Sequence, residues 1–376
     1  MLKLAVRNIF NFVILWLLVL ALIAIGSDVW HLGLKERLRK ADPRSALPIY
    51  ADTGYAAKIY KNQKVADFDY VPFIEWRHKP YASETLNIDS RGYRLIGGQT
   101  PGTGANANGL TLGIFGSSTV WGTGVDDSST IPAFFQNLNP DIRVTNYGER
   151  GFTSRQNLDE LINLAVDGTM PQVVVFYNGY NEVWTHCNYA FTKSLNGHGQ
   201  EQKLREALAV TEESRSSIYH YLVEPVVRLV FGVSGGKKYL PACSNDPARA
   251  EAVAKMIVEN WEIAQQIVSR HGGQFYAFLQ PHAHVGKPNT SYLDLSGDRV
   301  LRGEEFRTVY PLVQKLVREK NLAWFGDLST ALDGNQRYLL DDAHLGPDGN
   351  KIVAQQIQSF LKGKMNLAAM SQKAAQ

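Results

Sequence analysis

The feature that most constrains the fold is a change of pattern at Leu110, after which short apolar runs alternate with stretches of helical spacing. The runs with the length and composition of strands are residues 110–115, 142–146, 173–177, 274–279 and 322–325. Apolar residues with helical spacing lie between or after them, as at Leu158, Leu161, Ile162 and Ala165, and at Val353, Ile357, Phe360 and Leu361. Near-continuous apolar strands that alternate with helices predict a parallel sheet covered on both faces, in a three-layer α/β/α sandwich.

The rest of the chain predicts appendages to this sandwich. With 376 residues, the protein can bury one sizeable core and still carry additional segments. Residues 27–109 show no sustained period and end in a glycine-rich loop at 98–108, so we expect a lead-in region that packs on a main domain at 110–365. Residues 185–245 have polar and helical patterns, which predict a largely helical insertion. The polar, alanine-rich residues 366–376 predict a disordered tail.

The first 26 residues contain an apolar segment, Phe10 to Ile25, in which Asn11 is the only polar residue. This segment is slightly short for a membrane-spanning helix and slightly long for the core of a signal peptide, so a retained anchor and a cleaved signal both stay open. The small-x-small pattern that ends at Gly26 resembles a cleavage site, with Ser27 as the first mature residue.

The positive charges around this segment do not give a simple orientation. Positive charges after the segment, at Lys35, Arg37, Arg39 and Lys40, outnumber the positive charges before it. This distribution argues against a cytoplasmic N-terminus. An N-terminal apolar segment before one large domain is nevertheless the usual layout of an exported or tethered protein. We therefore expect a membrane contact through this segment and a domain outside the cytoplasm, either periplasmic or extracellular.

Composition and cysteine content narrow the partners. The formal net charge is only +3, and the chain has no basic run with interleaved aromatic residues, so nucleic acid is not an expected partner. The only cysteines are Cys187 and Cys243, which could form one disulfide in an oxidising compartment or remain two buried thiols. No metal-ligand spacing surrounds either cysteine, so we expect no metal site.

The residues that follow the strands are the first candidates for a functional site, because ligands of open parallel sheets bind beyond the carboxyl ends of the strands. Gly116-Ser117-Ser118 follows the first strand, and Gly148-Glu149-Arg150-Gly151 follows the second. Gly179-Tyr180-Asn181-Glu182 follows the third, and Asp341-Asp342-Ala343-His344 lies near the C-terminus.

These residue types match what acyl transfer through a serine requires. The hydroxyl loses its proton to a base, usually a histidine that a carboxylate orients, and the developing oxyanion needs preset hydrogen-bond donors. A glycine suits the donor position because its backbone can approach a ligand closely, and an asparagine amide donates without carrying a charge. The short Asp-x-x-His spacing allows one tight loop to deliver both the base and the carboxylate.

The four segments together resemble the SGNH hydrolases, also called the GDSL esterase/lipase family, over about residues 110–363. The family pattern is Gly-Asp-Ser, Asn-x-x-x-x-Gly, Gly-x-Asn-Asp and Asp-x-x-His. The resemblance implies a flavodoxin-like fold and catalysis without a cofactor. It implies Ser118 as the nucleophile, His344 as the base and Asp341 as its partner. It also implies the Gly151 N–H and the Asn181 side chain as oxyanion donors, beside the N–H of Ser118.

The chain departs from the family pattern at two positions outside this triad. Ser117 stands where the family has aspartate, and we expect it to be a turn residue that bonds local backbone. Glu182 stands where the family has a second aspartate. Alternatives remain for two roles: Asp342 and Asp348 compete with Asp341, and Gly148 competes with Gly151, although the spacing from Asn146 favours Gly151.

Other motifs give weaker evidence about the function. The segment after Gly116 lacks both the Gly-Lys-Ser/Thr of a phosphate-binding loop and the second glycine of an α/β-hydrolase nucleophile elbow. His282 and His284 follow the fourth strand and are candidates for substrate contact. Arg155 could face an anionic substrate, although a solvated helix start explains it as well.

The sequence therefore predicts a serine esterase that acts through an acyl-enzyme, on a small-molecule or glycan ester. An O-acylated cell-surface glycan or lipid is the expected substrate, from the predicted location. The same triad would also serve an O-acyltransferase that passes the acyl group to a glycan. A glycan-binding or assembly protein without catalysis is the other alternative.

Overall fold

The computed structural model describes residues 7–8, 10–16, 18–19, 41–97, 109–188, 239–362 and 364. The chain divides into two compact units, Met1–Pro43 and Arg44–Gln376. Three predicted features fall mainly or wholly outside the described residues: the glycine-rich loop at 98–108, most of the insertion at 185–245, and the tail at 366–376.

In the first unit, the described residues between 7 and 19 are helical, and their apolar side chains are exposed, such as Phe10, Phe12 and Leu15. Within the described residues, no helix combines the length and the apolar character needed to cross a membrane.

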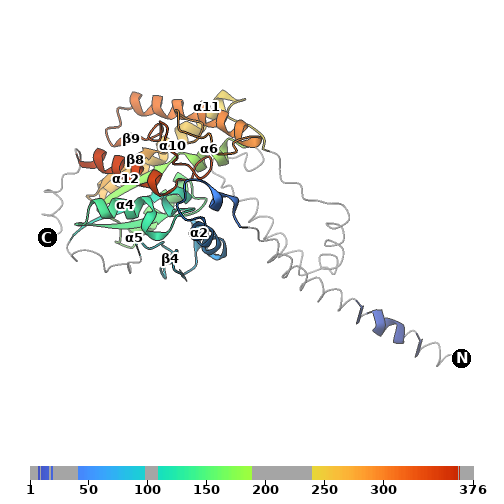
Figure 1. The fold of residues 1–376 in the computed structure, drawn as a ribbon. Helices are drawn as coiled ribbons and strands as arrows, with labels where there is room; N and C mark the ends of the chain where they lie inside the picture. Colours follow the sequence, from blue (N-terminus) through green and yellow to red (C-terminus); the bar gives the residue numbers. More distant parts are fainter. Residues whose placement is uncertain are drawn as a thin grey trace. The chain divides into compact units, whose positions relative to one another are not determined.

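The second unit is built on a five-stranded parallel sheet with the strand order β6-β5-β7-β8-β9. The parallel sheet predicted from the apolar runs is thus confirmed (Figure 1). The strands are β5 (Leu110–Gly116), β6 (Ile142–Gly148), β7 (Val173–Asn178), β8 (Gln274–Leu279) and β9 (Phe325–Asp327). The helices are α3 (Ser118–Trp121), α4 (Ile131–Leu138), α5 (Ser154–Val166), α6 (Tyr180–His186), α10 (Pro247–Arg270), α11 (Asp298–Glu319) and α12 (Pro347–Lys362), with a 3-10 turn, η2 (Asp127–Ser129).

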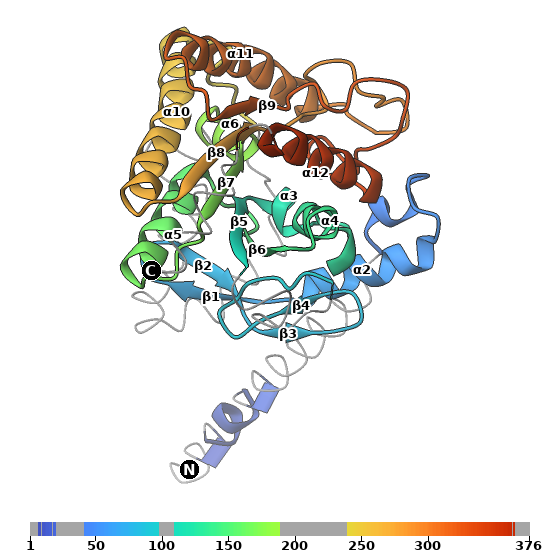
Figure 2. The same ribbon diagram turned by 90° about the vertical axis from the view of Figure 1, so that its left-hand side faces the viewer.

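Two hydrophobic cores lie on opposite faces of this sheet, because alternate side chains of a strand point to opposite sides. On β7, Val174 and Phe176 pack with residues of α5, α10 and α11, whereas Val173, Val175 and Tyr177 pack with α4 and α12. Figure 2 shows α5 and α10 on one side of the sheet and α4 and α12 on the other. All six residues of β7 are buried, as expected for a central strand covered on both faces.

The last strand differs from the prediction. Residues 322–325 were expected to form it, but β9 begins only at Phe325. Leu322 instead donates its N–H to Val317 O at 3.2 Å and accepts the N–H of Phe325 at 3.1 Å. The apolar residues at 322–324 therefore belong to the turn between α11 and β9.

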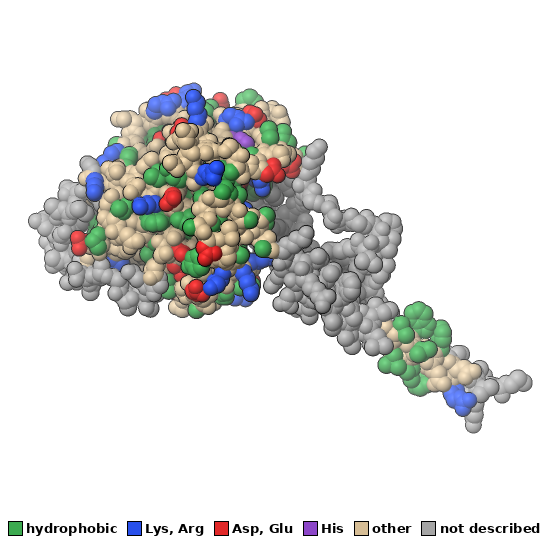
Figure 3. Space-filling model, viewed as in Figure 1, with side chains coloured by type: hydrophobic (Ala, Val, Ile, Leu, Met, Phe, Trp, Pro, Cys, Tyr) green, Lys and Arg blue, Asp and Glu red, His purple; other side chains and the backbone are tan. Residues whose placement is uncertain are grey.

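The described part of the lead-in region packs on the sandwich through short elements. They are η1 (Pro43–Ala46), α2 (Thr53–Val65) and two antiparallel pairs, β1 (Phe68–Val71) with β2 (Glu75–His78) and β3 (Tyr81–Ala82) with β4 (Asn87–Ile88). Trp121 of α3 is fully buried in one cluster with Leu86 and Ile88. On the face of this unit shown in Figure 3, basic and acidic side chains are interspersed.

Candidate active site

The junction between β5 and α3 fixes the position of Ser118. A Cβ at Gly116 would lie 2.5 Å from Val120 Cγ2 and 2.7 Å from Tyr177 O, so this tight strand end accepts only glycine. The chain then enters α3, of which Ser118 is the first residue. Ser118 is only 9% exposed, and its hydroxyl is held by this rigid turn rather than by a free loop.

His344 and Asp341 lie on one tight loop just before α12. The loop is closed by the Leu340 N–H, which donates to His344 O at 2.7 Å. Asp341 Oδ1 accepts the backbone N–H groups of Ala343 at 2.9 Å and His344 at 2.8 Å. The backbone thus holds the carboxylate in place independently of the imidazole.

The structure brings Ser118, His344 and Asp341 together. His344 Nε2 lies 2.8 Å from Ser118 Oγ, and His344 Nδ1 lies 2.7 Å from Asp341 Oδ2. Since a carboxylate only accepts, Nδ1 donates to Asp341, and Nε2 of the neutral ring accepts from the serine hydroxyl. This is the geometry that a general base needs in order to take a proton from a nucleophile.

The two competing aspartates have other partners. Asp342 Oδ2 forms an ion pair with the Arg302 guanidinium at 2.9 Å, and its Oδ1 accepts from Tyr180 Oη at 3.4 Å. Asp348 lies in the first turn of α12, where a carboxylate favours helix formation. The geometry therefore supports Asp341 as the partner of His344.

The charge of Asp341 is stabilised in the folded protein. Burial raises the pKa of its carboxyl, but His344, the Arg44 guanidinium and the hydrogen bonds from His344 outweigh burial and hold the pKa well below its usual range. Arg44 lies 2.7 Å from Asp341 Oδ2. Asp341 is thus ionised at neutral pH and can stabilise an imidazolium.

Of the two glycines that could donate a backbone N–H to the oxyanion, the structure favours Gly151 over Gly148. The Gly148 N–H donates to Asn146 Oδ1 at 2.9 Å, so it is already engaged. Gly151 has a φ of +86°, which favours glycine, and a Cβ there would lie 3.1 Å from the Trp76 ring. Trp76 Nε1 donates to Arg150 O at 2.9 Å and so packs the lead-in region against this loop.

Asn181, the other expected donor, is oriented by the same loop. Its Nδ2 donates to Phe152 O at 2.8 Å, which fixes the plane of the amide and leaves the second N–H of the group for another acceptor. The neighbouring Glu182 accepts the Gly179 N–H at 2.8 Å and also the Ser154 N–H. Glu182 thereby ties the start of α6 to the start of α5, a structural role for the position at which the chain departs from the family.

Ser117 does not behave as expected. It is the N-cap of α3, but its side chain makes no capping hydrogen bond. The hydroxyl is buried and has no hydrogen-bond partner in the part of the chain that the structure describes. The expectation that it bonds local backbone is wrong, because the strand end points this side chain into packed surroundings.

His282, His284 and Arg155 lie outside this constellation. His282 is 1% exposed and stacks on Phe306 at 3.7 Å, so it offers almost no surface to a ligand. Its Nδ1 accepts the His284 N–H at 3.2 Å. Burial lowers the pKa of both histidines. Arg155 pairs with Asp159 at 3.1 Å on the exposed side of α5.

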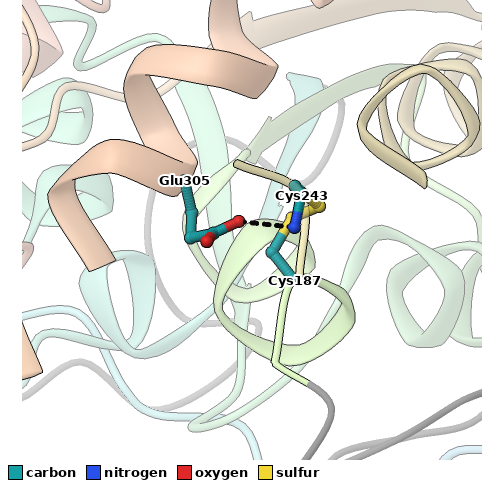
Figure 4. A group of neighbouring side chains, drawn as sticks. All are labelled: Cys187, Cys243 and Glu305. Atoms are coloured by element: carbon teal, nitrogen blue, oxygen red, sulfur yellow. Dashed lines mark hydrogen bonds between the residues drawn. A yellow bond between two sulfur atoms is a disulfide. The ribbon is translucent and has the colours of Figure 1, made fainter. Parts of the chain in front are cut away.

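Cys187 and Cys243 form a disulfide that joins the end of α6 to the segment before α10. Glu305 of α11 accepts the Cys243 N–H at 2.8 Å, beside the two sulfurs (Figure 4). These three residues gather as metal ligands would, but the sulfurs are bonded to each other. The cluster is therefore a covalent link between the end of α6, which carries Asn181, and the segment before α10, with Glu305 of α11 joined to it by a hydrogen bond.

Sequence reasoning missed two arginines that support the site, Arg44 and Arg94. Arg94 is 1% exposed, and its guanidinium donates to Trp121 O, Gly122 O and Val125 O at 2.7–2.9 Å, directly after α3. Its Nε donates to Asp127 at 2.8 Å. Both arginines come from a region without period or motif, so no local signal in the sequence singles them out.

Of the comparisons with known proteins, only the comparison with solved structures finds proteins that are similar to this chain. No protein-family model matches the chain, and no curated protein matches it. The similar solved structures include a lipolytic protein of the G-D-S-L family from Veillonella parvula, with 14% identity, 66% of this chain and 97% of that chain covered, and a TM-score of 0.38.

Two further similar structures are of enzymes named as esterases. One is a putative arylesterase from Agrobacterium tumefaciens, with 14% identity, 68% and 100% coverage and a TM-score of 0.38. The other is a mutant of an acetylxylan esterase from Geobacillus stearothermophilus, with 15% identity, 68% and 94% coverage and a TM-score of 0.34. The chain resembles the SGNH hydrolases.

Proposed function

We propose that the protein is a serine ester hydrolase that works through a covalent acyl-enzyme. The observation that carries the proposal is the contact of 2.8 Å between His344 Nε2 and Ser118 Oγ, with Asp341 on the other side of the imidazole. A nucleophile, a base and an orienting carboxylate in this order are the combination that acyl transfer needs.

The reaction has two halves. Ser118 Oγ attacks the ester carbonyl carbon while its proton passes to His344 Nε2, and Asp341 stabilises the imidazolium. The tetrahedral oxyanion accepts hydrogen bonds from the Gly151 N–H and the free N–H of Asn181. It collapses to the acyl-serine as His344 returns the proton to the departing alcohol. Water then attacks the acyl-serine, with His344 again as the base, and releases the acid and the free serine.

The substrate class is proposed from the expected location. A disulfide persists in oxidising compartments, and an apolar segment precedes the catalytic unit, which together favour a domain outside the cytoplasm. Acylated glycans and lipids of the cell surface are the esters present there. We propose that the substrate is an O-acylated glycan or lipid that lies near the membrane or in the surrounding compartment.

The two adjacent serines provide the test. Ser118→Ala should abolish hydrolysis of an aryl acetate and labelling by a fluorophosphonate probe, because the Ser118 hydroxyl is the one that lies against His344 Nε2 in the described part of the chain. Ser117→Ala should keep most of the activity, since the Ser117 hydroxyl makes no hydrogen bond within the described part of the chain. Equal loss in both variants, or labelling that persists in Ser118→Ala, would contradict the proposal.

The same assay separates hydrolysis from its two rivals. With an oligosaccharide present, a hydrolase releases free acetate, whereas an acyltransferase forms acetylated sugar. Absence of labelling in the folded wild-type protein would favour a glycan-binding protein without catalysis.

A further inference from the structure

The carboxylate of Asp341 has a second cationic partner besides His344. Arg44 Nη1 donates to Asp341 Oδ2 at 2.7 Å, the same oxygen that receives His344 Nδ1 at 2.7 Å. The side chains of Arg44 and Asp341 are 28% and 12% exposed, so the pair is shielded from most of the solvent. A charged hydrogen bond in such surroundings is stronger than the same pair on an open surface.

Arg44 is held in this position because it and its neighbours contact both the segment that carries Ser118 and the loop that carries His344. Its guanidinium lies over the Tyr60 ring at 4.8 Å, and Tyr60 Oη lies 3.1 Å from Tyr50 Oη. Tyr50 in turn donates to Gly124 O at 2.7 Å, shortly after the segment that carries Ser118. On the other side, a Cβ at Gly346 would lie 2.5 Å from Ile49, so the chain after Arg44 packs closely on the His344 loop.

We propose that Arg44 is a positioning residue of the active site, which fixes the Asp341 carboxylate toward His344 and offsets part of its negative charge. This inference rests on the proposed function. Because Oδ2 is held from two sides, the carboxylate cannot turn away from Nδ1 when the imidazole moves a proton. Arg44 comes from η1, outside the region that resembles the family, so the lead-in region supports the triad.

The charge of Arg44 has a separate effect from its hydrogen bond. The guanidinium offsets part of the negative charge of the Asp341 carboxylate, and together with His344 it holds the pKa of that carboxyl low. Other groups around Asp341 are Tyr180 and His282, which lie within its electrostatic reach, and Asp342, whose charge is paired with Arg302. Among the described residues, the side chains that contact Asp341 Oδ2 directly are those of Arg44 and His344.

The test compares Arg44→Gln, which removes the charge, with Arg44→Lys, which keeps it. For Arg44→Gln we expect kcat to fall about tenfold with KM nearly unchanged, because His344 alone then holds Asp341 Oδ2 and the imidazole is oriented less firmly. Arg44→Lys should keep most of kcat, and added guanidinium should restore part of kcat to Arg44→Gln. Arg155→Gln, at an exposed ion pair, is the matched control.

Fluorophosphonate titration of each preparation counts the active sites, so that misfolded protein does not enter kcat. An unchanged kcat in Arg44→Gln, or an equal loss in Arg44→Lys together with no rescue of Arg44→Gln by guanidinium, would overturn the inference. If Arg44→Gln does not fold, kcat and guanidinium rescue of Arg44→Met decide in the same way. Retained activity in Ser118→Ala would instead overturn the proposed function, whatever Arg44 does.

Discussion

Asn181 uses one amide group for two purposes, orientation and donation. One N–H is spent on Phe152 O at 2.8 Å, which leaves the other in a fixed direction. Such prior orientation is what makes a donor effective toward an oxyanion, because no reorganisation is needed when the charge develops.

Replacing Asn181 by alanine tests this role. We expect kcat to fall by roughly a hundred- to a thousand-fold with little change in KM, since the oxyanion forms only after binding. Steady-state kinetics with an aryl ester and a melting curve give the two readouts. The exposed Asn335→Ala serves as the control. A proportional rise of KM with unchanged kcat would show that Asn181 binds the ground state instead.

At this scale the sequence predicts residues whose roles depend on local spacing. The loop with Asp341 and His344 is so short that the spacing of these two residues predicts their contact. A glycine whose backbone approaches a ligand closely lies just after the end of its strand. Arg44 is 297 positions away from its partner Asp341, so only the folded chain relates the two. The sequence also could not predict that the Ser117 hydroxyl is buried without a hydrogen-bond partner among the described residues, because this depends on what surrounds the strand end.

Among the elements, α3 depends most on support from elsewhere. It has only four residues, and the carbonyl groups that follow it are buried. Arg94 supplies donors to these carbonyls and pairs with Asp127, so the lead-in region stabilises the helix on which Ser118 stands.

Arg94→Met should therefore lower the free energy of unfolding by about 3–5 kcal/mol, because it removes the cationic partner of the buried Asp127 carboxylate and one donor from each of three buried carbonyl groups. Urea unfolding followed by tryptophan fluorescence measures this loss. Arg91→Met is the matched control: its guanidinium is 55% exposed and pairs with Asp89, so the change should stay within about 1 kcal/mol. Equal effects in both variants would refute a supporting role for Arg94.

Elements with continuous apolar runs were predictable, and elements defined by pairing were not. The four inner or longer strands occur where the runs lie, since burial on both faces demands such runs. The edge strand β9 has three residues and shares its apolar run with the turn after α11, so periodicity alone placed it too early. The pairs β1–β2 and β3–β4 were not predicted, because strands of two to four residues carry too little pattern.

For the whole molecule, the buried histidines make stability depend on pH. Burial, followed by the charges of His284 and Arg302, lowers the pKa of His282 well below its ordinary value of 6.5. Below pH 6.5 the unfolded chain therefore binds a proton that the folded chain does not. The free energy of unfolding then decreases as the pH falls, down to the pKa of the folded state.

His282→Gln should flatten this dependence. The wild-type protein is expected to lose up to about 1.4 kcal/mol per pH unit from this group below pH 6.5, and the variant should lose less by that amount. Urea unfolding at pH values between 7.5 and 5 measures the slope. The exposed His271→Gln should leave it unchanged. Parallel slopes for wild type and His282→Gln would contradict the assignment.

The disulfide has a consequence for how this architecture can change in length. The Cα atoms of Cys187 and Cys243 lie 5.0 Å apart although 56 positions separate them, so the two ends of this stretch of sequence are fixed at one point. The entropy lost on closing a loop grows only with the logarithm of its length, and a covalent base removes even that dependence from the fold. Insertions between these cysteines can therefore diversify in size and sequence while the strands that carry Ser118 and Asn181 keep their register. The cystine separates a part of the protein that is free to vary from one that is not.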